Sequence, residues 1–234
     1  TTEIYTLSLH DALPILAPLI AGSVYVAVAV AVAAVAAWPV YASLSYVVLV
    51  VVASLAGAGI AVLATLRRWG GWLVTALLAG VFLVFSVPLA VPSRMSGPLD
   101  VLRGLGEAFA GLLLGWKDLV TVELPVGSYR NLLVPALVVF LVGTCTALML
   151  AWRADRRSAG AVVVGLAMAG FGLFFGRTSV SAPLTLGPIT LFAPVETLLG
   201  ILGLVSALLW LAWRTHDDRV QSLERAGVAS GVRV

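Results

Sequence analysis

Residues 42–91 read ASLSYVVLVVVASLAGAGIAVLATLRRWGGWLVTALLAGVFLVFSVPLAV, and this stretch decides the fold. Two apolar runs, 42–66 and 72–91, lie on either side of a short loop that contains Arg67 and Arg68. Each run is close to the roughly 20 residues that an α-helix needs to cross about 30 Å of hydrocarbon. The stretch therefore predicts two membrane-spanning helices joined by a short basic loop.

The same pattern continues on both sides of this pair of helices. Further apolar runs occupy 16–38, 132–152, 159–176 and 194–213. Only 11% of all residues are charged, 61% are hydrophobic and the mean hydropathy is +1.10, which excludes an ordinary soluble domain. We therefore predict an all-α, polytopic bundle with a six-span membrane domain over 16–213. Its expected partner is the lipid bilayer, and no nucleic acid is expected.

The N-terminal segment has a different origin from the rest. TTEIYTLSLHDALPI, residues 1–15, matches one reading frame of a common sequencing adapter, residue for residue. We therefore expect a non-native, adapter-derived segment and exclude it, with His10 and Asp11, from the fold and the chemistry. The native chain is then expected to begin upstream of Leu16 and to continue beyond Val234.

Small residues on two predicted spans indicate helix contacts. They are Ser54, Gly57, Ala58 and Gly59 on the second span, and Gly165, Ala169, Gly172 and Gly176 on the fifth. Small side chains let two helices approach closely in lipid, where no hydrophobic effect drives them together. We expect these positions to lie between packed spans.

Basic residues in the connections predict the orientation, because cytoplasmic loops are rich in Lys and Arg. One alternating set of connections contains Arg67, Arg68, Arg153, Arg156, Arg157, Arg214, Arg219, Arg225 and Arg233. The other set contains Arg94, Arg103, Lys117, Arg130 and Arg177. We therefore predict a multi-pass protein of the plasma membrane, with 93–131 outside and 214–234 as a cytoplasmic linker.

The long connection 93–131 contains an additional helix of a different kind. Its apolar residues recur at three- and four-residue steps: Leu99, Leu102, Leu105, Phe109, Leu112, Leu113 and Trp116. This spacing predicts an amphipathic helix lying in the membrane interface, with a re-entrant or core-covering segment as the alternative. Four glycines weaken it in isolation, so packing must support it. An extended stretch is predicted over 119–124.

The predicted spans lack the charged residues that a transporter needs near the centre of the membrane. No predicted span has an acidic or basic residue near its centre, where pumps and transporters usually keep one. Glu196 starts the sixth span and is expected to cap that helix. Cys145 is expected to be an inert thiol, and His216–Asp218 a solvated turn. We predict no catalytic, cofactor or metal site.

Two segments of the long connection resemble a known family. GWKDLVTVELPV at 115–126 and YRNLLVP at 129–135 are similar to the N-terminal membrane region of bacterial transglutaminase-like proteins of the TgpA type, particularly actinobacterial ones. PLAVP at 88–92 also fits, and the resemblance covers nearly all of 16–234. The matching motif comprises Trp116, Lys117, Asp118, Leu119, Pro125, Tyr129, Arg130 and Pro135.

The resemblance implies a membrane-anchoring module of a cell-envelope enzyme in the bacterial plasma membrane. In that family a further transmembrane helix follows the bundle, and then an extracytoplasmic domain with a Cys-His-Asp triad. That domain would be the module's own partner. None of its catalytic residues matches a position here, so we expect no catalysis and no cofactor from this chain. The alternatives are part of a transporter or permease and a non-catalytic polytopic scaffold. The oligomeric state stays open.

Overall fold

The computed structural model describes residues 9–91, 97–122, 124–127, 131–153, 155–175, 181–186 and 189–229. Its helices are α1 (Leu9–Tyr41), α2 (Leu44–Arg67), α3 (Gly71–Phe85), α4 (Pro98–Thr121), α5 (Val134–Ala151), α6 (Gly160–Phe175) and α7 (Pro194–Ala229). A π-helical turn, η1 (Ser86–Ala90), extends α3, and a short 3-10 helix, η3 (Arg156–Ala159), precedes α6. Strands β1 (Leu184–Leu186) and β2 (Ile189–Leu191) form an antiparallel hairpin that the sequence did not predict.

Six helices of the described chain are long and apolar enough to cross a membrane. They are Leu16–Tyr41, Leu44–Arg67, Gly71–Ala90, Val134–Ala151, Arg157–Phe175 and Pro194–Asp217. The predicted all-α, polytopic bundle is therefore confirmed, and each predicted span differs from its helix by only a few residues. Local apolar length is sufficient to predict these elements because a spanning helix satisfies its own backbone hydrogen bonds.

Both ends of the described chain extend the first and last spans. Helix α1 begins at Leu9, within the segment that we attribute to an adapter, and helical geometry does not separate native from appended residues. Helix α7 continues to Ala229, so the predicted linker is helical over most of its length. The expected solvated turn at His216–Asp218 is wrong, because these residues lie within this continuous helix.

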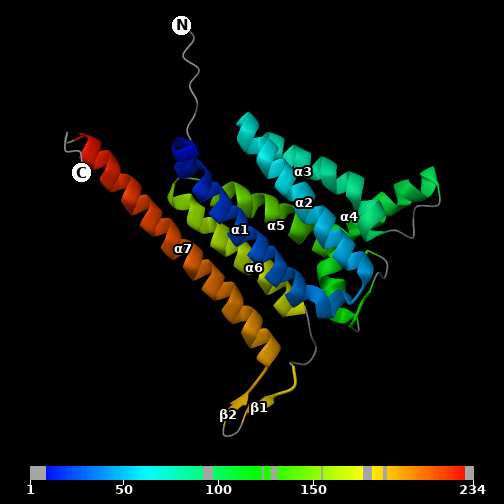
Figure 1. The fold of residues 1–234 in the computed structure, drawn as a ribbon. Coiled ribbons are helices and arrows are strands. Elements are labelled where there is room, and N and C mark those ends of the chain that lie inside the picture. The colour runs from blue at the N-terminus through cyan, green and yellow to red at the C-terminus, as the bar shows by residue number, and fades with distance from the viewer. Residues whose placement is uncertain are drawn as a thin grey trace.

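Different elements lie at the two ends of the bundle (Figure 1). The start of α1 and the end of α7 lie at one end, which we call the terminal end. Helix α4 and the β1–β2 hairpin lie at the other, which we call the loop end. An even number of spans requires this arrangement, because each span crosses once and the chain returns to its starting side.

Helix α5 is the centre of the bundle and contacts α1, α2, α3, α4 and α6. Its large side chains Leu137, Phe140 and Leu141 are almost completely buried. A glycine on α2 lets this helix approach α5 closely: a Cβ added to Gly57 would lie 2.5 Å from the Leu141 carbonyl oxygen. Helix α5 is therefore the central helix of the core, and at Gly57 its neighbour α2 comes close enough for contact between the two backbones.

The predicted small-residue contacts are confirmed at three glycines. Besides Gly57, a Cβ on Gly172 of α6 would lie 2.4 Å from the Ala37 backbone nitrogen, and one on Gly165 would lie 2.8 Å from the Tyr25 hydroxyl. Gly59 was predicted wrongly, since a Cβ there meets nothing within 4 Å. Helix geometry explains this: Gly59 is two residues from Gly57 and so lies on a different face. Gly176 lies outside the described residues.

Candidate functional site at the loop end

Helix α4 docks on the bundle through its smallest residues. Gly104, Ala108, Gly111, Gly115 and Leu119 are buried and recur every three or four positions, so they share one face. The bulky residues of the predicted apolar pattern, among them Leu99, Leu102 and Leu113, are exposed instead. The predicted amphipathic helix is confirmed. Several of its large apolar side chains face the surroundings of the bundle, while Leu119 and most of the small residues of its buried face pack against the protein.

The end of α4 differs from the prediction. An extended stretch was expected over 119–124, but 119–121 is helical. Leu119 is only 3% exposed and continues the buried face by one more turn, which stabilises the helix there. The Val122 amide then donates to the Asp118 carbonyl oxygen at 3.0 Å and closes the helix.

The segment before α5 holds α4 in place by close contact. A Cβ on Gly111 would lie 2.9 Å from the Asn131 carbonyl oxygen, and one on Gly115 would lie 3.0 Å from Cγ of Pro135. The Asn131 side-chain amide donates to the Glu107 carbonyl oxygen at 2.9 Å. We call α4 together with 122, 124–127 and 131–135 the cap. The cap is a packed element, since a Cβ at Gly111 would clash with backbone and one at Gly115 would be a tight contact.

Trp116 connects the cap to a third helix. Its ring meets Phe171 of α6 edge-on, with ring centroids 5.8 Å apart, and lies 6.2 Å from Phe175. The indole N–H donates to the Leu112 carbonyl oxygen at 3.0 Å, so the polar atom of the ring is satisfied. Aromatic contacts of this kind stabilise the position of α4 against α6.

The remaining motif residues divide between packed and exposed positions. Leu119 is buried in the cap, whereas Lys117 and Pro125 are exposed. Tyr129 and Arg130 lie outside the described residues. Trp116 contacts α6, Leu119 is buried on the docking face of α4, and Pro135 lies against Gly115.

Val126 ties the extended part of the cap to the first span. Its amide donates to the Val40 carbonyl oxygen at 2.8 Å, near the end of α1. Tyr41 is the next residue in the chain, and its hydroxyl donates to the Leu132 carbonyl oxygen at 3.2 Å. Nothing in the sequence pattern predicted these two bonds, because they join positions about ninety residues apart.

A small polar pocket of about 430 Å³ opens beside the cap. Its lining comprises Glu107, Ala110, Leu114, Asp118, Val122, Asn131 and Leu132. Glu107 and Asp118 are three helical turns apart and so share one face of α4. The lining residues have no hydroxyl, thiol or imidazole, and their ionisable groups are the carboxylates of Glu107 and Asp118. Within the described chain no group of three His, Cys, Asp or Glu residues could hold a metal ion.

Two other candidate residues have structural surroundings. Glu196 lies in the first turn of α7 as predicted, and its carboxylate accepts from the Ser181 amide at 3.1 Å and from the Ser181 hydroxyl. The Ser181 oxygen in turn accepts from the Val195 amide at 3.3 Å, so it caps the helix. Cys145 is 1% exposed, and its sulfur lies 4.0 Å from that of Met149.

Packing, more than reactive chemistry, therefore characterises the site that carries the family-like motif. Comparison with protein-family models, with curated proteins and with solved structures finds no match to this chain.

Proposed function

We propose that this chain is the membrane-anchoring module of a transglutaminase-like cell-envelope protein, with its loop end outside the cell. One observation carries the proposal. The segment that resembles the family is also the segment that packs onto the bundle most closely outside the spans, through Gly111, Gly115 and Trp116. A rigid cap of this kind suits a module that positions a catalytic domain close to the membrane surface.

The distribution of charge supports an anchor over a transporter. The charged residues of the six spans lie near the span ends, as Arg67, Arg157, Glu196 and Arg214 do. A charged group at the bilayer centre is costly and is kept where ions or substrates pass. A bundle without a charged residue near the centre of its described spans satisfies the requirements of anchoring.

The same distribution supports the proposed orientation. Arg67, Arg68, Arg153 and Arg157 lie in the short loops of the terminal end, which we propose is cytoplasmic. Short loops follow the positive-inside rule more faithfully than long ones.

Reporter fusions test the orientation. Alkaline phosphatase inserted between β1 and β2 is expected to be active, because it folds only outside the cytoplasm. Green fluorescent protein fused after Val234 is expected to fluoresce, because it matures inside. The opposite pattern would reverse the orientation and place the cap in the cytoplasm.

The source DNA tests the link to an enzyme. The reading frame after the Val234 codon is expected to encode a further apolar span and then a domain with Cys, His and Asp. Replacing that Cys by Ala is expected to abolish amine incorporation into a glutamine-containing peptide by the full-length protein. A frame that stops close to Val234 would favour the non-catalytic scaffold.

A further inference from the structure

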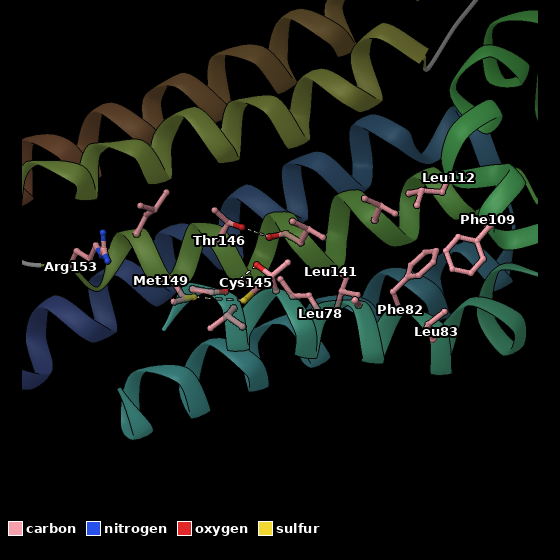
Figure 2. Close-up of a pocket in the computed structure, with 17 residues that line it drawn as sticks. Leu78, Phe82, Leu83, Phe109, Leu112, Leu141, Cys145, Thr146, Met149 and Arg153 are labelled. Atoms are coloured by element: carbon pink, nitrogen blue, oxygen red, sulfur yellow. Dashed lines mark hydrogen bonds between the residues drawn. The ribbon is translucent and has the colours of Figure 1, made fainter. Parts of the chain in front are cut away.

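An apolar groove of about 630 Å³ runs between α3 and α5 (Figure 2). It exists because α3 packs loosely: only 22% of its span window is buried, against 61% for α5. The walls come from Val74, Leu78 and Phe82 on α3 and from Leu141, Val142 and Met149 on α5. Side chains of this kind complement hydrocarbon.

The two threonine hydroxyls that line the groove need no hydrogen bond from an occupant. The Thr75 hydroxyl donates to the Gly71 carbonyl oxygen at 3.0 Å, and the Thr146 hydroxyl donates to the Val142 carbonyl oxygen at 2.7 Å. Each hydroxyl is therefore satisfied by its own helix. An occupant without hydrogen-bonding groups loses nothing by contact with these walls.

Aromatic and aliphatic side chains close the groove toward the loop end. The rings of Phe82 on α3 and Phe109 on α4 meet edge-on with centroids 6.5 Å apart, and Leu112 lies beside them (Figure 2). The cap therefore provides an apolar stop at one end of the groove.

A cation lies at the opposite end. Arg153 lines the groove at the terminal end, and its side chain is exposed (Figure 2). Arg214 donates to the Arg153 carbonyl oxygen at 2.7 Å, which holds the backbone in place. No carboxylate of the described residues forms an ion pair with the Arg153 guanidinium. Guanidinium binds phosphate oxygens well, through paired hydrogen bonds.

We propose that the groove binds one acyl chain of an anionic phospholipid, with the headgroup phosphate at Arg153 and the chain directed toward Phe82 and Phe109. Residues 138–153 of the α5 wall rise about 22 Å, which exceeds the depth of one hydrocarbon leaflet, about 15 Å, so the groove is long enough for the whole chain. A cationic open end and an apolar closed end match an amphiphile. This inference holds for either orientation of the bundle and is independent of the proposed function.

A transmembrane helix is a poorer occupant. An apolar helix would leave the isolated Arg153 cation at one end of the groove without an anionic partner, whereas a phospholipid headgroup supplies one. A helix from a second copy of the chain is therefore treated as a competing outcome of the test.

Photo-crosslinking of the full chain locates the lipid. The protein is reconstituted in vesicles of phosphatidylcholine and phosphatidylglycerol, in which the phosphatidylglycerol carries a photoreactive group halfway along one acyl chain. Adducts are expected to concentrate on peptides from 72–83 and 138–149. Adducts spread evenly over the exposed surface of α7 as well would overturn the proposal.

Matched variants test the two ends of the groove. Ala79→Trp fills the groove from α3, whereas Ala76→Trp adds the same ring on an exposed position that does not line it. Native mass spectrometry is expected to show at least tenfold less retained phosphatidylglycerol for Ala79→Trp and no change for Ala76→Trp. Equal retention would overturn the site. Loss of a two-chain complex with lipid retention unchanged would assign the groove to a second copy.

The charged end has its own pair of variants. Arg153→Gln is expected to weaken phosphatidylglycerol retention about fivefold, the effect of one Arg near an anionic headgroup, and raising salt should reduce the difference. Arg157→Gln removes another exposed charge, one that does not line the groove, and is expected to change nothing. Equal retention by wild type and Arg153→Gln would overturn the placement of the headgroup.

Discussion

Helices α5 and α7 are both apolar on nearly every face of their membrane spans, yet they have opposite positions in the molecule. The α5 window is 61% buried and that of α7 only 11%. Helix α5 contacts five helices, whereas the main contacts of α7 are with α1 and α6. Lipid tails accept an apolar side chain as readily as a protein core does. Hydrophobicity therefore indicates that a helix spans the membrane, and it does not indicate where in the bundle the helix lies.

The residues that face each helix explain the difference. Gly57 lets the backbone of α2 approach the backbone of α5. Gly143 on α5 leaves room for the Met168 side chain of α6. Helix α7 instead offers one narrow stripe, in which Ala207, Trp210 and Arg214 are buried. A central helix needs small residues on several faces, whereas a peripheral helix needs them on one.

Breaking the closest approach to α5 is expected to have the largest effect. In Gly57→Leu the new Cβ would lie 2.5 Å from the Leu141 carbonyl oxygen, so α2 and α5 must separate. We expect the free energy of unfolding in mixed micelles to fall by about 3 kcal/mol or more. Gly59→Leu is the control, because a Cβ there meets nothing within 4 Å, and it should change stability by less than about 1 kcal/mol. Equal losses would show that α2 does not approach α5 at Gly57.

Emptying the core around α5 is expected to have the next largest effect. Leu137 is fully buried, so Leu137→Ala leaves a cavity that its neighbours fill only in part. The free energy of unfolding should fall by about 2–4 kcal/mol, measured by the same titration. A loss below about 1 kcal/mol would contradict the central position of α5.

Removing the anchor of α7 is expected to have a smaller effect. Trp210 is 5% exposed and stacks on Tyr25 of α1, with ring centroids 4.9 Å apart. Trp210→Ala should lower the free energy of unfolding by about 1–2 kcal/mol, because the stacking is lost but lipid can enter the vacated space. Combined with Leu137→Ala, the two losses should add within about 0.5 kcal/mol. A much larger combined loss would mean that α7 supports the core.

The smallest effect is expected on the exposed side of α7. Leu202 is 49% exposed, so Leu202→Ala exchanges one lipid contact for another. The change in unfolding free energy should stay within about 0.5 kcal/mol. Because Leu137→Ala removes the same atoms, the two variants compare identical chemistry at the centre and the periphery. A cost at Leu202 comparable to that at Leu137 would indicate that a partner covers this face.

The candidate site was predicted only in part. The periodicity of 99–116 was sufficient to predict the amphipathic helix, since three- and four-residue spacing is a local property. The docking face was missed, because the bulky residues dominated the pattern while Gly111 and Gly115 made the contacts. Trp116 and Phe171 are fifty-five residues apart in the sequence, so local periodicity could not predict their contact.

Sequence alone determined the six spans and the amphipathic helix, because apolar length and helical spacing are properties of neighbouring residues. Only the tertiary structure decided which helix is central, how α4 docks and where α3 leaves a groove beside α5. These features depend on which small residue meets which backbone, as Gly57 meets Leu141. In lipid every apolar face is already solvated, so steric fit between distant segments, and not hydrophobicity, selects the packing.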